Sequence, residues 1–192
     1  ELIEYHIMFN INTVHLDARK AMAHAFNYDF LHNDIFNNEI EPLYQPIMNG
    51  MQYFENASQL SGLNHYNLTL ARQFLLNSAE FGPNCTAAGL DQFSTDYDWE
   101  NVAYGSSPLA TYEYPYMGSS DIHNQIASLI QNTMAKIGIN VILTEISDWS
   151  SYLTIVLENA TEFDMVFNGW ALDYNDPTNI LQPLYSSNST YR

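Results

Sequence analysis

The chain has 192 residues, 46% of them hydrophobic and 14% aromatic, so it is long enough and apolar enough to fold around a core. Its 22 acidic residues outnumber the five Lys and Arg residues, and the formal net charge at pH 7 is −17. Because nucleic acids and anionic membrane surfaces are bound through Lys and Arg, this balance argues against both kinds of partner.

The first half predicts one strand followed by helical segments. Apolar periodicity and capping residues place these elements at residues 2–10, 17–26, 28–37 and 67–82. Asp17 and Asn67 are expected to cap two of the helices, because their side chains accept hydrogen bonds from free backbone N–H groups. Residues 41–66 and 83–107 are rich in turn formers, and we expect them to be long irregular connections.

The second half alternates strands with helices. Strands are predicted at residues 109–117, 139–146 and 163–170, with helices beginning after Ser119–Asp121 and after Asp148. This order indicates an α/β layer with parallel pairing and right-handed crossovers. Ligands of such sheets usually bind beyond the carboxyl ends of the strands.

The most informative segment is the end of the last predicted strand. The apolar run from Phe163 stops at Gly169 and Trp170, and a polar loop that contains Asp173 follows. An indole face and a carboxylate at a strand end suit a small cationic, partly apolar ligand. The candidate ligand-binding residues are Asp173, Trp170, Trp149, Asn168 and Tyr174. The alternative roles are turn capping for Asp173, core packing for Trp170 and helix anchoring for Trp149.

No catalytic or metal-binding motif stands out. The six histidines show no HxxxH or HxH spacing, so no metal site is predicted. The absence of GxSxG, P-loop and Rossmann motifs indicates a protein that is not an enzyme and holds no cofactor. A glycosidase pair among the carboxylates is the one enzymatic alternative.

Several segments together resemble the dipeptide- and oligopeptide-binding proteins of peptide ABC transporters, which form family 5 of the extracellular solute-binding proteins. The resemblance is carried by Phe9-Asn10, Asp17–Ala21, Ala25–Asp29, Asn67–Phe81, Ile126–Val141 and Phe163–Pro177. It implies a lobe of the type II periplasmic-binding-protein-like fold, with a mixed sheet flanked by helices. Residues 1–192 would then form a single α/β lobe, a fragment that covers much of the second lobe of a larger two-lobed protein.

The resemblance also implies a function and a place in the cell. Such a protein binds peptides between two lobes and delivers them to an ABC transporter permease, and its partners are the peptide, the permease and the missing second lobe. It is extracellular or periplasmic and tethered to the outer face of the cell membrane. In peptide-binding relatives, the carboxylate that matches Asp173 pairs with the α-amino group of the ligand.

One departure from the family pattern bears on the cargo. Several peptide binders have a basic residue at the position of Phe167, where it meets the peptide carboxylate. A longer peptide, or a ligand without that charge, is therefore expected here. Two alternatives stay open: an oligosaccharide-binding member of the same family, and a structural or adhesive surface domain without a small ligand.

Overall fold

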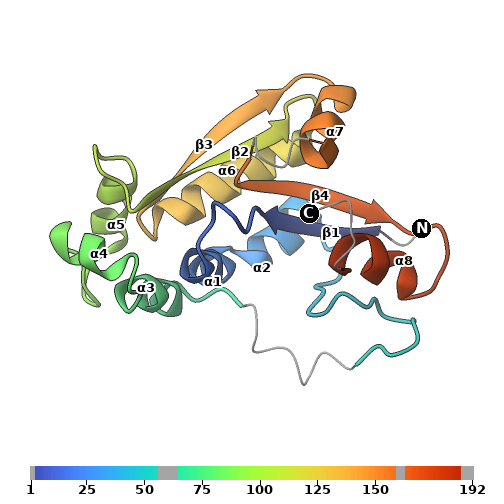
Figure 1. Ribbon diagram of the computed structural model, residues 1–192, viewed down its shortest axis with the longest axis horizontal. Coiled ribbons are helices and arrows are strands. Elements are labelled where there is room, and N and C mark those ends of the chain that lie inside the picture. The colour runs from blue at the N-terminus through green and yellow to red at the C-terminus, as the bar shows by residue number, and fades with distance from the viewer. Residues whose placement is uncertain (1–2, 56–64, 159–162, 187–192) are drawn as a thin grey trace.

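The computed structural model describes residues 3–55, 65–158 and 163–186 (Figure 1). Its strands are β1 (Ile3–Phe9), β2 (Ala110–Met117), β3 (Ile139–Ile146) and β4 (Met165–Ala171). Its helical elements are α1 (Leu16–Ala25), α2 (Tyr28–Phe30), η1 (Leu31–Ile35), α3 (Leu68–Leu76), α4 (Gly82–Ala87), α5 (Asp96–Ala103), α6 (Asp121–Ala135), α7 (Trp149–Glu158), α8 (Thr178–Ile180) and η3 (Leu181–Tyr185). Within these described ranges no helix is both long and apolar enough to cross a membrane.

The strands form two pairs of opposite kind. β2 and β3 run parallel, from Ala110 opposite Ile139 to Met117 opposite Ile146. β1 and β4 run antiparallel along their whole length. The two pairs meet where the Asp164 N–H donates to the Glu113 carbonyl at 3.1 Å, so β4 lies between β2 and β1 (Figure 1). This mixed arrangement confirms the predicted α/β fold.

Parallel pairing was correct for one strand pair and wrong for the last strand. We expected residues 163–170 to extend a parallel sheet after the second helix, but β4 pairs antiparallel with β1. The reason is topological, because strand order along the chain does not reveal which earlier strand a later one will join. The N-terminal strand is the partner, more than 150 residues away.

Local capping follows the sequence closely. The Asn67 side chain accepts from the N–H of Leu70 at 3.0 Å and begins α3, as predicted. Ser120 caps α6, and the Asp148 carboxylate accepts from the N–H of Ser151 at 2.9 Å where α7 begins. At α1 the N-cap is His15 instead, and Asp17 lies in the first turn.

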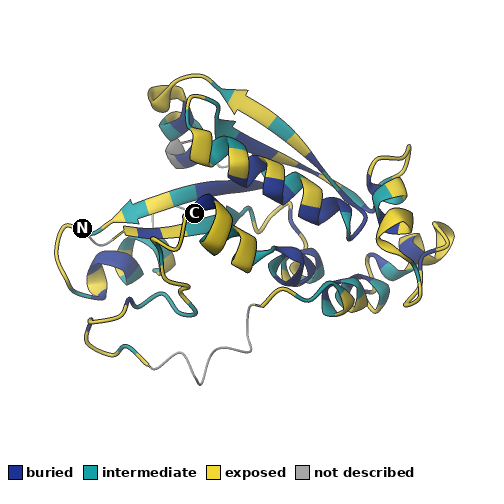
Figure 2. Cartoon of the chain, turned by 180° about the vertical axis from the view of Figure 1, so that it is seen from behind, coloured by how far each residue is buried: buried dark blue, intermediate teal, exposed yellow. Residues whose placement is uncertain are grey.

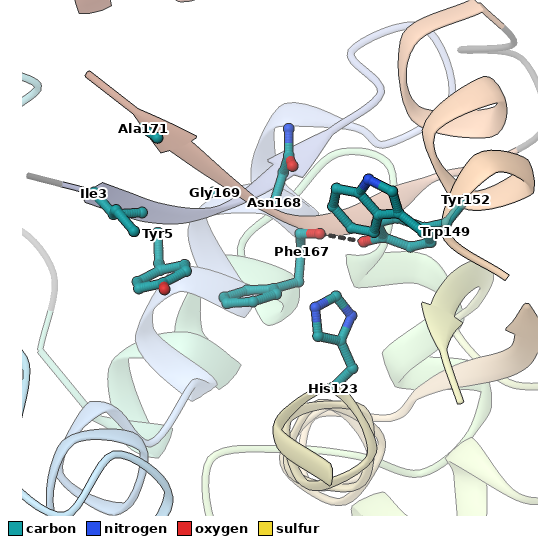
Figure 3. Close-up of a pocket in the computed structure, with 9 residues that line it drawn as sticks. All are labelled: Ile3, Tyr5, His123, Trp149, Tyr152, Phe167, Asn168, Gly169 and Ala171. Atoms are coloured by element: carbon teal, nitrogen blue, oxygen red, sulfur yellow. Dashed lines mark hydrogen bonds between the residues drawn. The ribbon is translucent and has the colours of Figure 1, made fainter. Parts of the chain in front are cut away.

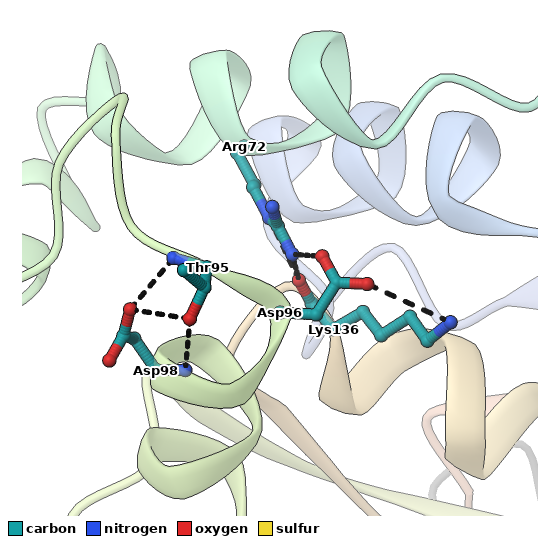
Figure 4. Close-up of polar contacts among 5 residues, drawn as sticks. All are labelled: Arg72, Thr95, Asp96, Asp98 and Lys136. Carbon is teal, nitrogen blue, oxygen red and sulfur yellow. Dashed lines mark hydrogen bonds and ion pairs between the residues drawn. The ribbon is translucent and has the colours of Figure 1, made fainter.

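The prediction of an irregular connection at residues 83–107 was wrong, because α4 and α5 lie there. The helix predicted at residues 67–82 ends at Leu76 as α3, and Pro83 stands in the first turn of α4, where its missing N–H sacrifices no hydrogen bond. Thr95 and Asp98 form a reciprocal capping box at the start of α5 (Figure 4). Residues 41–55, 65 and 66 contain no helix or strand, as expected, and residues 56–64 lie outside the described ranges.

A large apolar core joins the helices to the strands. Its fully buried side chains include Trp99, Tyr114, Ile126, Ile130 and Leu75, which come from α3, α5, α6 and β2. Figure 2 shows α6 buried along the side that faces the strands and exposed along its outer side. A smaller cluster of Tyr152, Val156, Phe163 and Val166 attaches α7 to β4. This second cluster fixes α7 beside the beginning of β4.

Arg72 ties three helices together at the other end of the molecule (Figure 4). Its guanidinium donates to the Lys136 carbonyl, at 3.0 Å from Nε and 2.8 Å from Nη2, just past the end of α6. Nη2 also donates to Asp96 Oδ1 at 2.6 Å, and the guanidinium carbon lies 5.3 Å from the centre of the Trp99 ring. Arg72 thereby joins α3 to α5 and to the end of α6.

Candidate functional site

A pocket of about 220 Å³ lies where β1 and β4 meet the first turns of α6 and α7 (Figure 3). Its lining consists of Ile3, Tyr5, His123, Trp149, Tyr152, Phe167, Asn168, Gly169 and Ala171. Because α6 follows β2 and α7 follows β3, the pocket lies beyond the carboxyl ends of the parallel pair. This is where the strand order places a ligand.

Aromatic rings form most of the pocket wall. Tyr5 stacks on Phe167 with ring centres 5.7 Å apart, and His123 meets the edge of Phe167 at 5.3 Å. Trp149 stacks on Tyr152 at 5.8 Å. Tyr5 and Trp149 remain 43% and 53% exposed, so their rings offer apolar surface to a ligand.

The described lining contains no Asp, Glu, Lys or Arg. Burial lowers the pKa of His123, whose Nδ1 accepts a hydrogen bond from the Met117 N–H at 3.4 Å. Both facts keep this ring neutral at pH 7. Burial raises the pKa of Tyr152, whose hydroxyl donates to the Phe167 carbonyl (Figure 3). The pocket therefore recognises a ligand through apolar surface and neutral hydrogen-bonding groups.

One edge of β4 borders this pocket. The other edge is occupied by β1. The Phe167 carbonyl points away from β1, since it accepts from Tyr152 of α7. The backbone N–H and C=O groups of successive residues point to alternate edges of an antiparallel strand. Those of Gly169 and Ala171 therefore point away from β1, like the Phe167 carbonyl. No strand of the described residues pairs with β4 there, which leaves a short strand edge open to a partner.

The structure separates the predicted ligand-binding residues. Trp149 and Asn168 line the pocket, although the Asn168 side chain points away from the Phe167 and His123 rings (Figure 3). Trp170 packs on the other side of the strand against a cluster of Met48, Met51 and Ile180. Its Nε1 donates to the Asn179 carbonyl at 2.9 Å.

Asp173 and Tyr174 lie in the loop after β4, exposed and outside the pocket lining. The Asp173 carboxylate makes no hydrogen bond or ion pair with another residue of the described ranges. Capping is instead done by Asp176, which accepts from the Thr178 N–H at 2.8 Å. The Asp173 carboxylate can therefore bind a ligand that extends beyond this pocket.

The sequence matches one protein family along nearly all its length. Residues 2–192 match the model of the bacterial extracellular solute-binding proteins, family 5 Middle. The chain belongs to this family. Over 80 residues, or 41% of the chain, it is also 32% identical to the periplasmic oligopeptide-binding protein OppA of Salmonella typhimurium.

Solved structures show the same fold. The chain is similar to a dipeptide-binding protein from Pseudoalteromonas sp. SM9913 in complex with Met-Leu, with a TM-score of 0.69 at 20% identity over 94% of the chain. It is also similar to the periplasmic binding protein DppA from Helicobacter pylori in complex with the peptide STSA, with a TM-score of 0.65 at 22% identity over 94% of the chain. The chain covers 31% and 29% of these two proteins and 14% of OppA.

Sequence reasoning missed part of this candidate site. Tyr5 was read only as a residue of a strand, because its position in the pocket depends on the β1–β4 register. His123 could have been found, since it stands in the first turn of the helix that follows β2. Within the described ranges, no group of three or more His, Cys, Asp or Glu could hold a metal ion.

Proposed function

We propose that this chain is one lobe of an extracellular solute-binding protein that binds peptides between two lobes and delivers them to an ABC transporter permease. The observation that carries the proposal is an uncharged aromatic pocket bordered by the open edge of β4. A strand edge binds a peptide main chain whatever its sequence, and a neighbouring pocket accepts a side chain.

In this proposal the peptide main chain pairs with Gly169 and Ala171, and one peptide side chain enters between Tyr5 and Trp149. Asp173 lies two residues beyond the end of β4 and meets the α-amino group. Such a charge-assisted hydrogen bond contributes about 1.5–3 kcal/mol. Asn168, Trp170 and Tyr174 provide further contacts on the far side of the strand and in the following loop.

The pocket in this lobe is only part of a binding site. Its volume of about 220 Å³ is below the roughly 300–1,000 Å³ of complete small-molecule sites. A second lobe that closes over β4 would supply the remaining wall, and the ligand would shift the equilibrium towards the closed form. Binding by the isolated chain should accordingly be weak.

The first test is mass spectrometry of small molecules that co-purify with the full-length protein. Peptides in the released fraction support the proposal. Their absence, together with no thermal shift across a peptide library, would refute it. The full-length protein should also be found outside the cytoplasm, held at the outer face of the membrane.

An oligosaccharide is a second candidate cargo. The exposed Tyr5 and Trp149 rings and the lack of cationic lining residues suit stacking against sugars. Tight binding of cellobiose without any peptide binding would select this alternative. No response to either peptides or sugars would favour a structural or adhesive domain.

A further inference from the structure

A second cavity, of about 450 Å³, lies along the outer side of α6. It shares no residue with the pocket beside β4, and its volume is in the range of complete small-molecule sites. Its lining consists of Asn27, Phe30, Tyr66, Asn124, Gln125, Ser128, Leu129, Asn132, Thr133 and Lys136. Figure 2 views the molecule from the side on which α6 lies in front of the strands.

One helix face builds most of this groove. Asn124, Ser128, Asn132 and Lys136 stand four residues apart, so they form a single row along α6. Twelve residues of helix give this row a length of about 18 Å. The facing wall comes from α2 and from the segment before α3. A groove of this length suits a short chain of several units.

The described lining of the groove contains no carboxylate, although the chain carries 22 acidic residues. The one cation in this described lining, Lys136, lies 3.9 Å from Asp96 Oδ2, which offsets the charge (Figure 4). The remaining polar groups are amides and hydroxyls. An uncharged ligand therefore fits this groove better than an ionic one.

Several of these polar groups still have hydrogen-bonding capacity. The Asn124 amide donates to the Gly118 carbonyl, and its oxygen accepts no hydrogen bond from the residues that the structure describes. Asn27 accepts from the Phe30 N–H, and its two donor hydrogens have no partner among the same residues. Gln125 and Asn132 are exposed and make no side-chain hydrogen bond to another described residue. An amide both donates and accepts, which matches neighbouring hydroxyls on a sugar ring.

Aromatic surface completes the groove. Phe30 and Tyr66 are 44% and 36% exposed on the wall opposite α6. Apolar ring faces flanked by amides suit pyranose rings, whose carbon faces are apolar and whose rims carry hydroxyls. No strand borders the groove, so it offers no backbone edge to a peptide.

We infer that this groove is a second binding site, specific for a short neutral glycan and separate from the site beside β4. The inference does not depend on the cargo of that first site. It gives the protein a surface that holds uncharged saccharides while the cleft between the lobes carries its own ligand.

The test uses the full-length protein and three neutral trisaccharides: maltotriose, mannotriose and triacetylchitotriose. Binding is followed by calorimetry and by ligand-observed NMR. At least one trisaccharide should bind. The double variant Gln125→Ala/Asn132→Ala should weaken that binding about tenfold, as expected for the loss of two neutral hydrogen bonds.

A matched control variant locates the site. Gln73→Ala removes an exposed amide from α3, outside the groove, and should leave trisaccharide binding unchanged. The inference is overturned if no trisaccharide binds, if the double variant binds as well as the unmodified protein, or if Gln73→Ala causes the same loss as the double variant. Circular dichroism and the melting temperature confirm that each variant is folded.

Discussion

Tyr5 lies directly opposite Gly169 in the β1–β4 ladder, and its ring covers the position where a larger residue would have a side chain. A Cβ atom on residue 169 would lie 3.0 Å from Cε1 and 3.1 Å from Cδ1 of Tyr5. The glycine thus lets the Tyr5 ring lie flat against the strand, where it also stacks on Phe167.

Replacing Gly169 by Ala should displace the Tyr5 ring and reshape the pocket. We expect a loss of stability of about 1 kcal/mol, measured by urea unfolding, and weaker ligand binding by the full-length protein. In a Tyr5→Ala background the same replacement should be nearly neutral, because the clash partner is gone. Equal losses in both backgrounds would show that the ring contact is not the cause.

Glu4 makes the stability of the chain depend on pH. Its side chain is buried on β1, with Oε1 3.7 Å from His6 Nδ1 and 3.4 Å from the Tyr185 hydroxyl, and Oε2 has no hydrogen-bond partner in the part of the chain that the structure describes. Burial raises the pKa of Glu4 to about 7, an effect that the Tyr185 hydrogen bond partly offsets. The pKa is higher in the folded state, so the contribution of Glu4 is complete below pH 4.5 and is lost as the pH rises through 7.

The Glu4→Gln variant should therefore be more stable than the unmodified chain above pH 7, by about 2 kcal/mol at pH 8. Thermal melts between pH 4 and pH 9 provide the measurement. Replacement of the exposed Glu39 by Gln should leave the profile unchanged. A Glu4→Gln profile parallel to that of the unmodified chain above pH 6 would contradict the assignment.

His6 makes the stability of the chain depend on pH in the opposite direction from Glu4. Burial lowers its pKa from 6.5 to about 4, so its contribution is complete above pH 6.5 and is lost as the pH falls through 4. The two residues together predict greatest stability in mild acid, between about pH 4 and pH 7.

Replacement of Arg72 should lower the free energy of unfolding more than replacement of any other charged surface residue. Its side chain is only 14% exposed, and its loss leaves the Lys136 carbonyl without its donors at the end of α6. We expect Arg72→Ala to cost about 2–3 kcal/mol of unfolding free energy. Asp96→Asn, which removes a half-exposed partner, should cost less than about 1 kcal/mol. Similar costs for the two variants would show that the carbonyl contacts contribute little.

Tyr152 holds the start of α7 beside β4. Tyr152→Phe removes its hydrogen bond to the Phe167 carbonyl without changing the packing of the ring. The expected cost is about 1 kcal/mol, accompanied by weaker ligand binding, since Trp149 stacks on the same ring. Tyr116→Phe is the matched control and should change neither property. If both variants bind ligand like the unmodified protein, Tyr152 does not position the pocket.

The sequence predicted local features of the fold, such as helix starts, better than contacts between distant segments. Asn67, Ser120 and Asp148 each begin a helix as predicted, because an N-cap acts on the N–H groups of the next few residues. The pairing of β4 with β1 was missed, since it depends on contacts across almost the whole chain. The short helices within 83–107 were missed because they lack a long apolar periodicity.

The site was only partly predictable for the same reason. Trp149 could be assigned to a pocket because it follows a strand whose carboxyl end lies at the edge of the sheet where ligands usually bind. Tyr5 enters the pocket only through the register of the antiparallel ladder. Trp170 was predicted to bind ligand, yet strand alternation turns it to the side opposite Phe167, against the Met48 cluster.

The carboxylate of Asp173 gives the most direct test of peptide binding. A full-length protein should be titrated with a binding peptide, with the same peptide after N-acetylation, and with both after Asp173→Asn. We predict that acetylation or Asp173→Asn alone weakens binding about ten- to a hundredfold, and that the two changes together do little more than either one. Undiminished affinity for the acetylated peptide, or an Asp173→Asn protein that still prefers the free amino group by the same factor, would contradict the account.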